Sequence, residues 1–341
     1  MAQSRMTVTV NMPVTVSLDD RIRLLSAVLA ATHYPQEAQD RGRHLAHSHA
    51  RNTQKYLLNQ GMNEHPAVKS LEDMLNRKVP LEALFTMMLL MPWPDLEVDS
   101  LPPFVPGNWP QQLHDFYLKS NIRGFWTENE LPWQDAVTQS KLIFENVSFN
   151  EFLGQFTGDV SEKFVFMPNI SYPAVEEMGL RYKDQLIAIV PPPQAWGDSP
   201  PWPYDDETQL ISVYRGAVTQ YARLLLHGYF RLNTEKLEEA KEKELPISDE
   251  LKVVYPTWED QFMMLYTKAL VAMYLEDHVD PLEAKAYMLI ERKANSIALL
   301  PGTISVLRRY LRERGNRYES FMDFLPYFPT QLRVAKRIVS L

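Results

Sequence analysis

Cysteine is absent from the 341 residues of the sequence, and its absence excludes several kinds of chemistry. Disulfide bridges, thiolate metal sites and cysteine nucleophiles all require this residue. A chain that uses no disulfides fits a reducing compartment, and we therefore expect a cytoplasmic protein.

Glycine is scarce, with 12 residues, whereas proline is abundant, with 25. The sequence contains no glycine-rich phosphate-binding loop, no dinucleotide fingerprint and no nucleophile elbow. We therefore expect no conventional cofactor. The many prolines predict helices that are joined by stiff, irregular connections.

Long apolar runs are also missing. The longest, residues 84–93, is too short to cross a bilayer and contains a proline. Residues 1–17 lack the apolar centre of a signal peptide, so we expect no membrane insertion. The net charge of −8 and the lack of a basic stripe argue against a nucleic-acid partner. The densest basic run, residues 308–317, is predicted to be the solvated face of a helix.

The composition, with 45% hydrophobic and 23% charged residues, is typical of a globular protein. Helical patterns dominate the first half of the chain, including long ones at residues 36–60 and 132–155, after an edge strand at residues 7–16. We expect a mainly helical region over residues 1–158 and a second region over residues 159–341. Together they are predicted to form one compact unit.

The second region begins with two short apolar runs, residues 163–168 and 185–190, that predict strands. A proline-rich loop at residues 191–203 follows, and then a long helix at residues 207–232. A charged stretch at residues 234–251 leads to a second long helix, at residues 258–275, that is apolar almost all round. The second long helix should be buried. The sequence thus predicts an α+β fold that is predominantly α-helical.

Two clusters contain side chains that bind metals in other proteins. His44, His47 and His49 are close in sequence, but on a continuous helix His49 projects about 140° away from His44. Three ligands for one ion would therefore require a break in the helix, and the alternative is a polar helix face. The second cluster is an acidic turn formed by Glu276, Asp277, His278 and Asp280. It lacks the spacing and the glycine of a calcium-binding loop, and we interpret it as a solvated helix end.

The proline-rich loop at residues 191–203 carries Trp196 and Trp202 just before the long helix. Aromatic side chains on a stiff loop beside a helix N-terminus can line a ligand cleft. They can equally be core anchors that fix the loop in place. The sequence leaves both interpretations open.

The order of these elements is that of gluzincin-type zinc peptidases, whose first long helix carries His-Glu-x-x-His and whose second supplies a glutamate ligand. Short stretches carry a closer resemblance: EHPAV at 64–68, LHDFY at 113–117 with Asn121 and Phe125, FLGQFTG at 152–158, Asn169 with Tyr172, and NRYESFMDF at 316–324. On these stretches the chain resembles a bacterial family of uncharacterised zincin-like metallopeptidases. The resemblance implies a zincin-like core with two long central helices, in which a small antiparallel sheet packs on a long central helix.

The zinc-binding motif is degenerate in this chain. In the best match to His-Glu-x-x-His, Thr219 and Arg223 replace the histidines and Gln220 replaces the glutamate; Thr267 stands at the third ligand position. Threonine is a poor zinc ligand, arginine is a permanent cation, and glutamine cannot accept a proton. The resemblance therefore implies a site without metal and without catalytic residues.

The long helix at residues 207–232 has two faces. An apolar stripe comprises Leu210, Val213, Tyr214, Ala217, Val218, Tyr221, Leu224 and Leu225, and the opposite side comprises Ser212, Arg215, Thr219, Arg223 and His227. The polar side either meets solvent or, if the resemblance holds, lines the former active-site groove. The expected groove residues are Tyr172, Trp202, Arg215 and His227. In that groove Arg215, Arg223 and His227 would meet an acidic group.

We expect a catalytically inactive, metallopeptidase-like protein that binds a protein or peptide partner. One alternative is an active metal-dependent hydrolase or peptidase with non-standard ligands. Its ligands would come from His44, His47, His65 and His114 with nearby carboxylates. Another alternative is a structural subunit of a larger complex, with the helical region as its contact surface. The sequence gives no indication of the oligomeric state.

Overall fold

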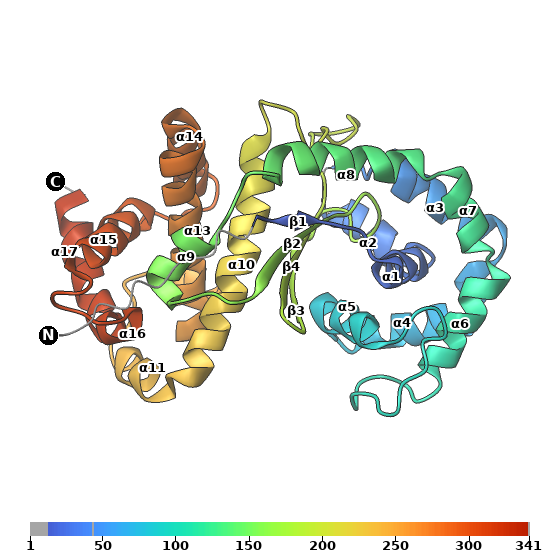
Figure 1. The fold of residues 1–341 in the computed structure, drawn as a ribbon, viewed down its shortest axis with the longest axis horizontal. Helices are drawn as coiled ribbons and strands as arrows, with labels where there is room; N and C mark the ends of the chain where they lie inside the picture. Colours follow the sequence, from blue (N-terminus) through green and yellow to red (C-terminus); the bar gives the residue numbers. More distant parts are fainter. Residues whose placement is uncertain (1–12, 43, 340–341) are drawn as a thin grey trace, which may run out of the picture. The chain divides into compact units, whose positions relative to one another are not determined.

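The computed structural model describes residues 13–42 and 44–339 (Figure 1). Most of the edge strand predicted at residues 7–16 lies outside the described residues. The fold is predominantly α-helical with one small sheet, which confirms the α+β prediction. Within the described part of the chain, no helix combines the length and hydropathy needed to cross a bilayer.

The chain divides into two units, each made of separate stretches. Val14–Val147 and Lys163–Val213 form the first, which we call the sheet unit. Ser148–Glu162 and Tyr214–Leu341 contribute to the second, which we call the helical unit. The sequence predicts a single division after residue 158, whereas the units in the structure are discontinuous.

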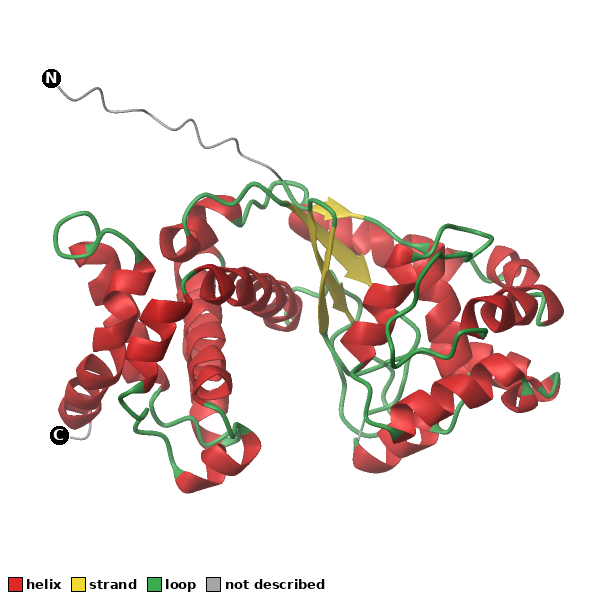
Figure 2. Cartoon of the chain, turned by 90° about the horizontal axis from the view of Figure 1, so that it is seen from below, coloured by secondary structure: helices red, strands yellow, loops and turns green. Residues whose placement is uncertain are grey.

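All strands in the described residues, yellow in Figure 2, belong to the sheet unit. In chain order its elements are β1 (Thr15–Val16), α1 (Asp20–Ala30), α2 (Tyr34–Arg41), α3 (Ser48–Asn59), η1 (Met62–Glu64), α4 (Pro66–Asn76), α5 (Leu81–Leu90), α6 (Trp109–Lys119), α7 (Ile122–Glu128), α8 (Leu131–Phe144), β2 (Lys163–Pro168), β3 (Met178–Tyr182) and β4 (Gln185–Val190).

The sheet has the strand order β1-β2-β4-β3 and is mixed. β2 pairs in parallel with both β1 and β4, and only β3 and β4 are antiparallel. The prediction of an antiparallel sheet is therefore wrong. A strand that the sequence analysis missed, β3, lies between the two predicted strands in the chain. Its tight turn at Lys183, which has a φ of 53°, reverses the chain once more and makes β4 parallel to β2.

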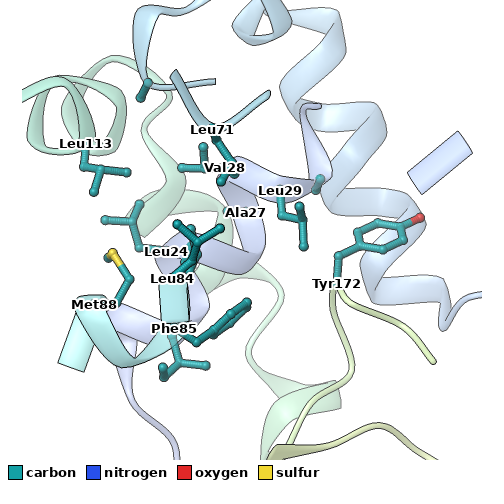
Figure 3. Packing of buried hydrophobic residues seen from close by; sticks show 14 of the residues in the cluster. Leu24, Ala27, Val28, Leu29, Leu71, Leu84, Phe85, Met88, Leu113 and Tyr172 are labelled. Carbon is teal, nitrogen blue, oxygen red and sulfur yellow. The ribbon is translucent and has the colours of Figure 1, made fainter. Parts of the chain in front are cut away.

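Both faces of the sheet carry buried side chains. On one face, Val165 and Ile187 belong to a core cluster with residues of α1 and α5, whose packing Figure 3 shows. On the other face, the ring of Phe166 lies 4.6 Å from that of Phe144 and 6.1 Å from that of Tyr204. Burial on both faces explains why β2 and β4 read as continuous apolar runs rather than as alternating ones.

Two helices that the sequence predicts as continuous are each divided. Residues 36–60 fall into α2 and α3, and residues 44–47, which precede α3, lie outside any helix. The His47 imidazole accepts a hydrogen bond from the His49 N–H (3.1 Å), so it caps α3 as a Ser or Asn side chain would. Residues 132–155 fall into α8 and α9 (Asn150–Thr157), and the break coincides with the passage from the sheet unit to the helical unit.

The helical unit contains α9, most of α10 (Leu210–Leu232), α11 (Thr234–Lys241), α12 (Asp249–Val254), α13 (Trp258–His278), α14 (Pro281–Lys293), α15 (Leu300–Glu313), α16 (Phe321–Phe324), η2 (Leu325–Tyr327) and α17 (Phe328–Val339). α13 is buried along almost its whole length, as its apolar sequence predicts. The charged stretch predicted at residues 234–251 contains α11 and the start of α12.

The two long helices α10 and α13 contact each other in antiparallel fashion. Near the start of α10, the ring of Tyr214 lies 5.7 Å from that of Tyr274, near the end of α13. Near the end of α10, the ring of Phe230 lies 5.9 Å from that of Phe262, near the start of α13. The apolar stripe of α10 is largely buried and its opposite side is half-buried or exposed, as predicted.

A buried ion pair joins α13 to α14. Lys268 Nζ lies 2.6 Å from Glu291 Oε1, and Glu291 is 3% exposed. The Asn295 amide donates a hydrogen bond to the other oxygen of Glu291 (2.8 Å). Both carboxylate oxygens are therefore satisfied inside the helical unit.

Candidate functional site

A pocket of about 280 Å³ lies in the sheet unit, just beyond the carboxyl ends of β2 and β4. Ile170 and Pro192, which line it, come shortly after these two strands. In sheets with parallel strands, ligands bind in the crevice at this edge. The other lining residues come from the start of α3, from α8 between Leu131 and Gln139, and from the end of the proline-rich loop with the residue that follows it: His47, Ser48, Leu131, Pro132, Asp135, Ala136, Gln139, Pro201, Trp202, Pro203 and Tyr204.

Tyr204 fixes the proline-rich loop to the strand ends. Its buried hydroxyl donates a hydrogen bond to Val190 O at the end of β4 (2.7 Å) and accepts one from Asn169 N–H just after β2 (2.9 Å). Its own N–H donates to Gln139 Oε1 in α8 (3.1 Å). Burial raises the pKa of Tyr204 well above its usual value, so the hydroxyl stays protonated. These bonds, with the prolines in the lining, make the pocket largely preformed.

The structure separates the two tryptophans of the loop. Trp202 lines the pocket and is 43% exposed, and its backbone N–H donates to Pro193 O (2.9 Å). Trp196 is 76% exposed and lies outside the lining, with its ring 5.1 Å from that of His44. The cleft interpretation therefore fits Trp202, and neither tryptophan is a buried core anchor.

The pocket has one formally charged side chain among its described lining residues, the exposed Asp135. This carboxylate makes no hydrogen bond or ion pair with any residue that the structure describes. His47 Nδ1 accepts the His49 N–H, so the neutral ring of His47 carries its proton on Nε2. Burial, and then the charge of Arg51, lowers the pKa of His47 and keeps it neutral at pH 7. The described lining therefore contains one negative charge, that of Asp135, and the exposed indole of Trp202.

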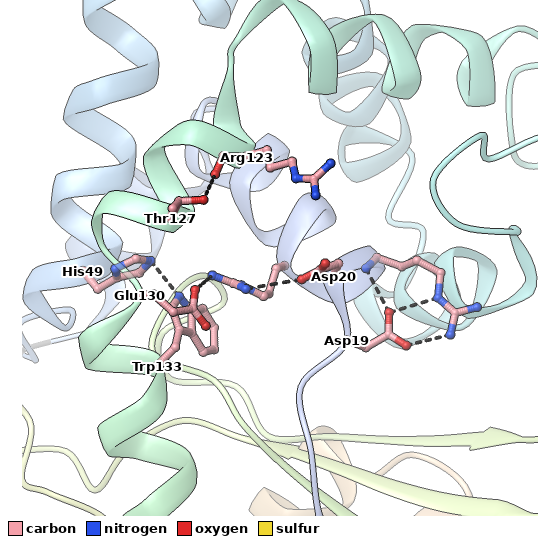
Figure 4. A network of polar contacts seen from close by, with 9 residues as sticks. Asp19, Asp20, His49, Arg123, Thr127, Glu130 and Trp133 are labelled. Carbon is pink, nitrogen blue, oxygen red and sulfur yellow. Dashed lines mark hydrogen bonds and ion pairs between the residues drawn. The ribbon is translucent and has the colours of Figure 1, made fainter.

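Arg23, near the start of α1, belongs to a polar network of the sheet unit whose members Asp20 and Glu130 are labelled in Figure 4. Its guanidinium carbon lies 4.6 Å from the ring centroid of Trp126 and 5.1 Å from that of Trp133. Arg23 Nη2 donates to Glu130 Oε2 (2.8 Å), and Nη1 donates to Asp20 Oδ1 (3.3 Å). Arg23 is 8% exposed, so these contacts are largely shielded from water.

His49 belongs to the same network, as a neutral acceptor. The Trp133 Nε1–H donates to His49 Nε2 (2.9 Å), as a dashed line in Figure 4 shows. Burial, and then the charges of His47 and Arg23, lowers the pKa of His49 to about 3. His49 therefore has a structural role in the core, and its Nε2 is occupied by the hydrogen bond from Trp133.

This low pKa predicts acid sensitivity of the sheet unit. Between the usual histidine pKa of 6.5 and about 3, the unfolded chain binds a proton at His49 and the folded chain does not. Stability is therefore lost as the pH falls, and His49 contributes about 2 kcal/mol of that loss between pH 7 and pH 5. Urea denaturation at both pH values should show a smaller loss for His49→Gln, whose amide oxygen can still accept the Trp133 N–H. Equal losses in the two proteins would contradict the prediction.

The other histidines proposed as metal ligands make structural contacts. His44 Nδ1–H donates to Ala195 O (2.8 Å), His65 caps α4 and donates to Asp115 Oδ2 (3.0 Å), and His114 Nδ1–H donates to Pro94 O (3.3 Å). In the described residues, no three His, Asp or Glu side chains are grouped closely enough to hold a metal ion.

The acidic turn lies at the end of α13, as predicted. Arg308 Nη2 lies 2.6 Å from Glu276 Oε2 and 2.8 Å from Asp277 Oδ1. Asp280 accepts a hydrogen bond from Leu282 N–H (2.6 Å) and caps α14. These carboxylates are therefore engaged by an arginine and by a helix start.

The four positions that the resemblance aligns with zinc ligands and a catalytic glutamate lie on the two long helices of the helical unit. Thr219, Gln220 and Arg223 are on α10, and Thr267 is on α13. The ring contacts show that the two helices are antiparallel, so Arg223 and Thr267 lie at about the same height along the helix pair. Thr267 is buried, and its hydroxyl donates to Met263 O of its own helix (2.8 Å).

The four expected groove residues are divided between the units. Tyr172 and Trp202 belong to the sheet unit, whereas Arg215 and His227 lie on α10 in the helical unit. Tyr172 is buried in the core cluster of Figure 3, where burial raises its pKa to about 12. It does not line the pocket that contains Trp202.

The sequence analysis missed Asp135, Gln139 and Tyr204. Asp135 and Gln139 are four residues apart, and this spacing places both on one face of α8. The spacing alone does not show that the face borders a pocket. Tyr204, which directly follows the proline-rich loop, could have been grouped with Trp202 as an aromatic residue of the same segment.

No protein-family model, no curated protein and no solved structure matches this chain. The resemblance to zincin-like metallopeptidases therefore stays a hypothesis that depends on short motifs. Functional inference depends on the chemistry of the pocket and of the two long helices.

Proposed function

We propose that this chain is a non-catalytic, metallopeptidase-like protein that binds a peptide segment of a partner protein. The observation that carries the proposal is the preformed pocket at the carboxyl edge of β2 and β4, with Trp202 accessible in its wall. Rigid, accessible aromatic side chains supply much of the affinity of protein interfaces. Small-molecule pockets usually measure about 300–1,000 Å³, so this smaller pocket suits a side chain better than a cofactor.

The chemistry of the degenerate positions supports binding rather than hydrolysis. Gln220 has no carboxylate with which to activate a water molecule, and Arg223 carries a permanent positive charge. The Thr267 hydroxyl is used in a hydrogen bond within α13. A zinc-dependent reaction between α10 and α13 would need side chains that these positions do not provide.

Trp202→Ala is expected to weaken peptide binding by at least about 30-fold, which corresponds to the loss of an aromatic hot spot. The peptides would be selected from a random library on the full-length chain, and their affinity would be measured by fluorescence anisotropy. Selection of no peptide would contradict the proposed function.

Trp196→Ala is the matched control, because Trp196 is on the same loop but outside the pocket. It should leave the affinity nearly unchanged, and an equal loss in both variants would argue against the pocket. Mass spectrometry should find the bound peptide intact. Cleavage that is abolished by His→Ala changes at His44, His47, His65 or His114 would instead support the hydrolase alternative.

A further inference from the structure

We propose that the pocket recognises a basic side chain of the bound peptide, and arginine in preference to lysine. This inference depends on the proposed peptide-binding function and specifies the class of peptide. Asp135 supplies the one formal charge in the described lining, and no described residue neutralises it. A cation that enters the pocket therefore gains a charge-assisted partner, whereas an acidic side chain would be repelled.

Trp202 provides the second element of recognition. The backbone N–H of Trp202 donates to Pro193 O, and the residue lines the pocket and is 43% exposed, so a flat cation can stack against its indole. A guanidinium group is planar, weakly hydrated and able to donate two hydrogen bonds to one carboxylate. An ammonium group lacks this planarity and is more strongly hydrated. Trp202 and Asp135 together therefore favour arginine.

No positive side chain opposes the cation within the described lining. His47 is neutral at pH 7, and Arg51, which lowers its pKa, does not line the pocket and donates to Ala46 O (3.2 Å). The neutral donors Ser48 and Gln139 remain available for the polar groups of a peptide backbone.

The starts of α3 and α8 also border the pocket, and their partial positive charges oppose a cation. These partial charges are reduced because two backbone N–H groups at the helix starts already have acceptors. The His49 N–H donates to His47, and the Trp133 backbone N–H donates to Glu130 O (3.0 Å). The full charge of Asp135 offsets the remainder. We expect a peptide carbonyl oxygen at the helix starts and the basic side chain beside Asp135.

Fluorine NMR on the full-length chain labelled with 5-fluorotryptophan tests the inference directly. The chain has 7 tryptophans, and the signal of Trp202 is the one that disappears in Trp202→Phe.

The probes are acetylated, amidated pentapeptides Gly-Gly-X-Gly-Gly, in which X is arginine, lysine, citrulline or glutamate. The arginine peptide should shift the Trp202 signal saturably, and it should bind with higher affinity than the lysine peptide. Citrulline, a neutral isostere of arginine, should bind at least about tenfold more weakly, and glutamate should cause no saturable shift.

Asp135→Asn should lower the affinity for the arginine peptide about tenfold and abolish the difference between arginine and citrulline. Asp198→Asn is the matched control, since Asp198 is an exposed acid of the proline-rich loop outside the pocket. It should leave the affinity unchanged.

Two results would overturn the inference. In the first, arginine and citrulline peptides bind equally and Asp135→Asn has no effect; peptide binding would then stand without the preference for a cation. In the second, none of the four peptides shifts the Trp202 signal at any concentration up to the solubility limit of the peptide. The library-selected peptides then decide the proposed function separately, because it fails only if they do not bind either.

Discussion

Replacing Lys268 with methionine is expected to lower the free energy of unfolding of the helical unit by about 3 kcal/mol. Lys268 Nζ lies 2.6 Å from Glu291, which is 3% exposed. Without the ammonium group the carboxylate stays buried, and the Asn295 amide is its remaining hydrogen-bond partner among the described residues. Leaving a buried charge unpaired costs far more than the pair contributes to stability. Urea denaturation followed by circular dichroism measures the loss.

Two further variants separate this effect from a general loss of charge. Lys236 and Glu239 form an exposed pair at 3.4 Å, so Lys236→Met should change stability by less than about 0.5 kcal/mol. The double change Lys268→Met with Glu291→Leu removes both charges and should recover most of the lost stability. A double variant as unstable as Lys268→Met alone would show that packing, rather than the unpaired carboxylate, is responsible.

The second large effect is expected for Arg23→Met, which should destabilise the sheet unit by about 3 kcal/mol. Methionine keeps much of the aliphatic volume but loses the stacking on Trp126 and Trp133 and the ion pair with Glu130. Because Arg23 is 8% exposed, water cannot replace these contacts efficiently. Thermal denaturation monitored by circular dichroism would show the change as a lower Tm.

Arg23→Lys tests whether the planar group matters. Lysine keeps the charge but cannot stack on two indole rings, so we expect it to recover only part of the stability. Arg123, which is exposed on α7 and labelled in Figure 4, is the matched control. Arg123→Met should alter stability by less than about 0.5 kcal/mol. If Arg23→Lys were as stable as the native chain, charge alone would explain the effect.

The elements that the sequence predicted well are those whose burial pattern is local. α13 is apolar on nearly every side and is buried along almost its whole length, and the apolar stripe of α10 is largely buried. β2 and β4 appear in the sequence as short apolar runs of the right length. In each case neighbouring residues carry the signal, so no distant contact is needed to interpret it.

The elements that were missed depend on contacts between distant residues or on unusual caps. β3 contains Gly179 and Arg181, so its apolar run is interrupted, and its pairing with β4 decides the direction of the strands. The break before α3 relies on a histidine cap, because His47 is not one of the usual capping residues. A helix period alone does not reveal such a stop.

The same reason limited the prediction of the site. Trp202 was recognised because aromatic residues on a proline-rich loop stand out in a sequence. Asp135 and Ile170 were not, because they join the pocket only through the folding of α8 beside the ends of β2 and β4. The chemistry of the pocket is thus a product of long-range contacts.

The discontinuity of the sheet unit has a consequence for the order of events on the ribosome. β1 pairs with β2, and β2 is synthesised only after all of the helices from α1 to α9. At about 5–20 residues per second, roughly 5–30 s pass between the synthesis of α1 and α5 and that of the strands that complete their core. During that time their apolar faces are exposed to chaperones and to other nascent chains. A fragment that stops at residue 158 would remain permanently in this unfinished state.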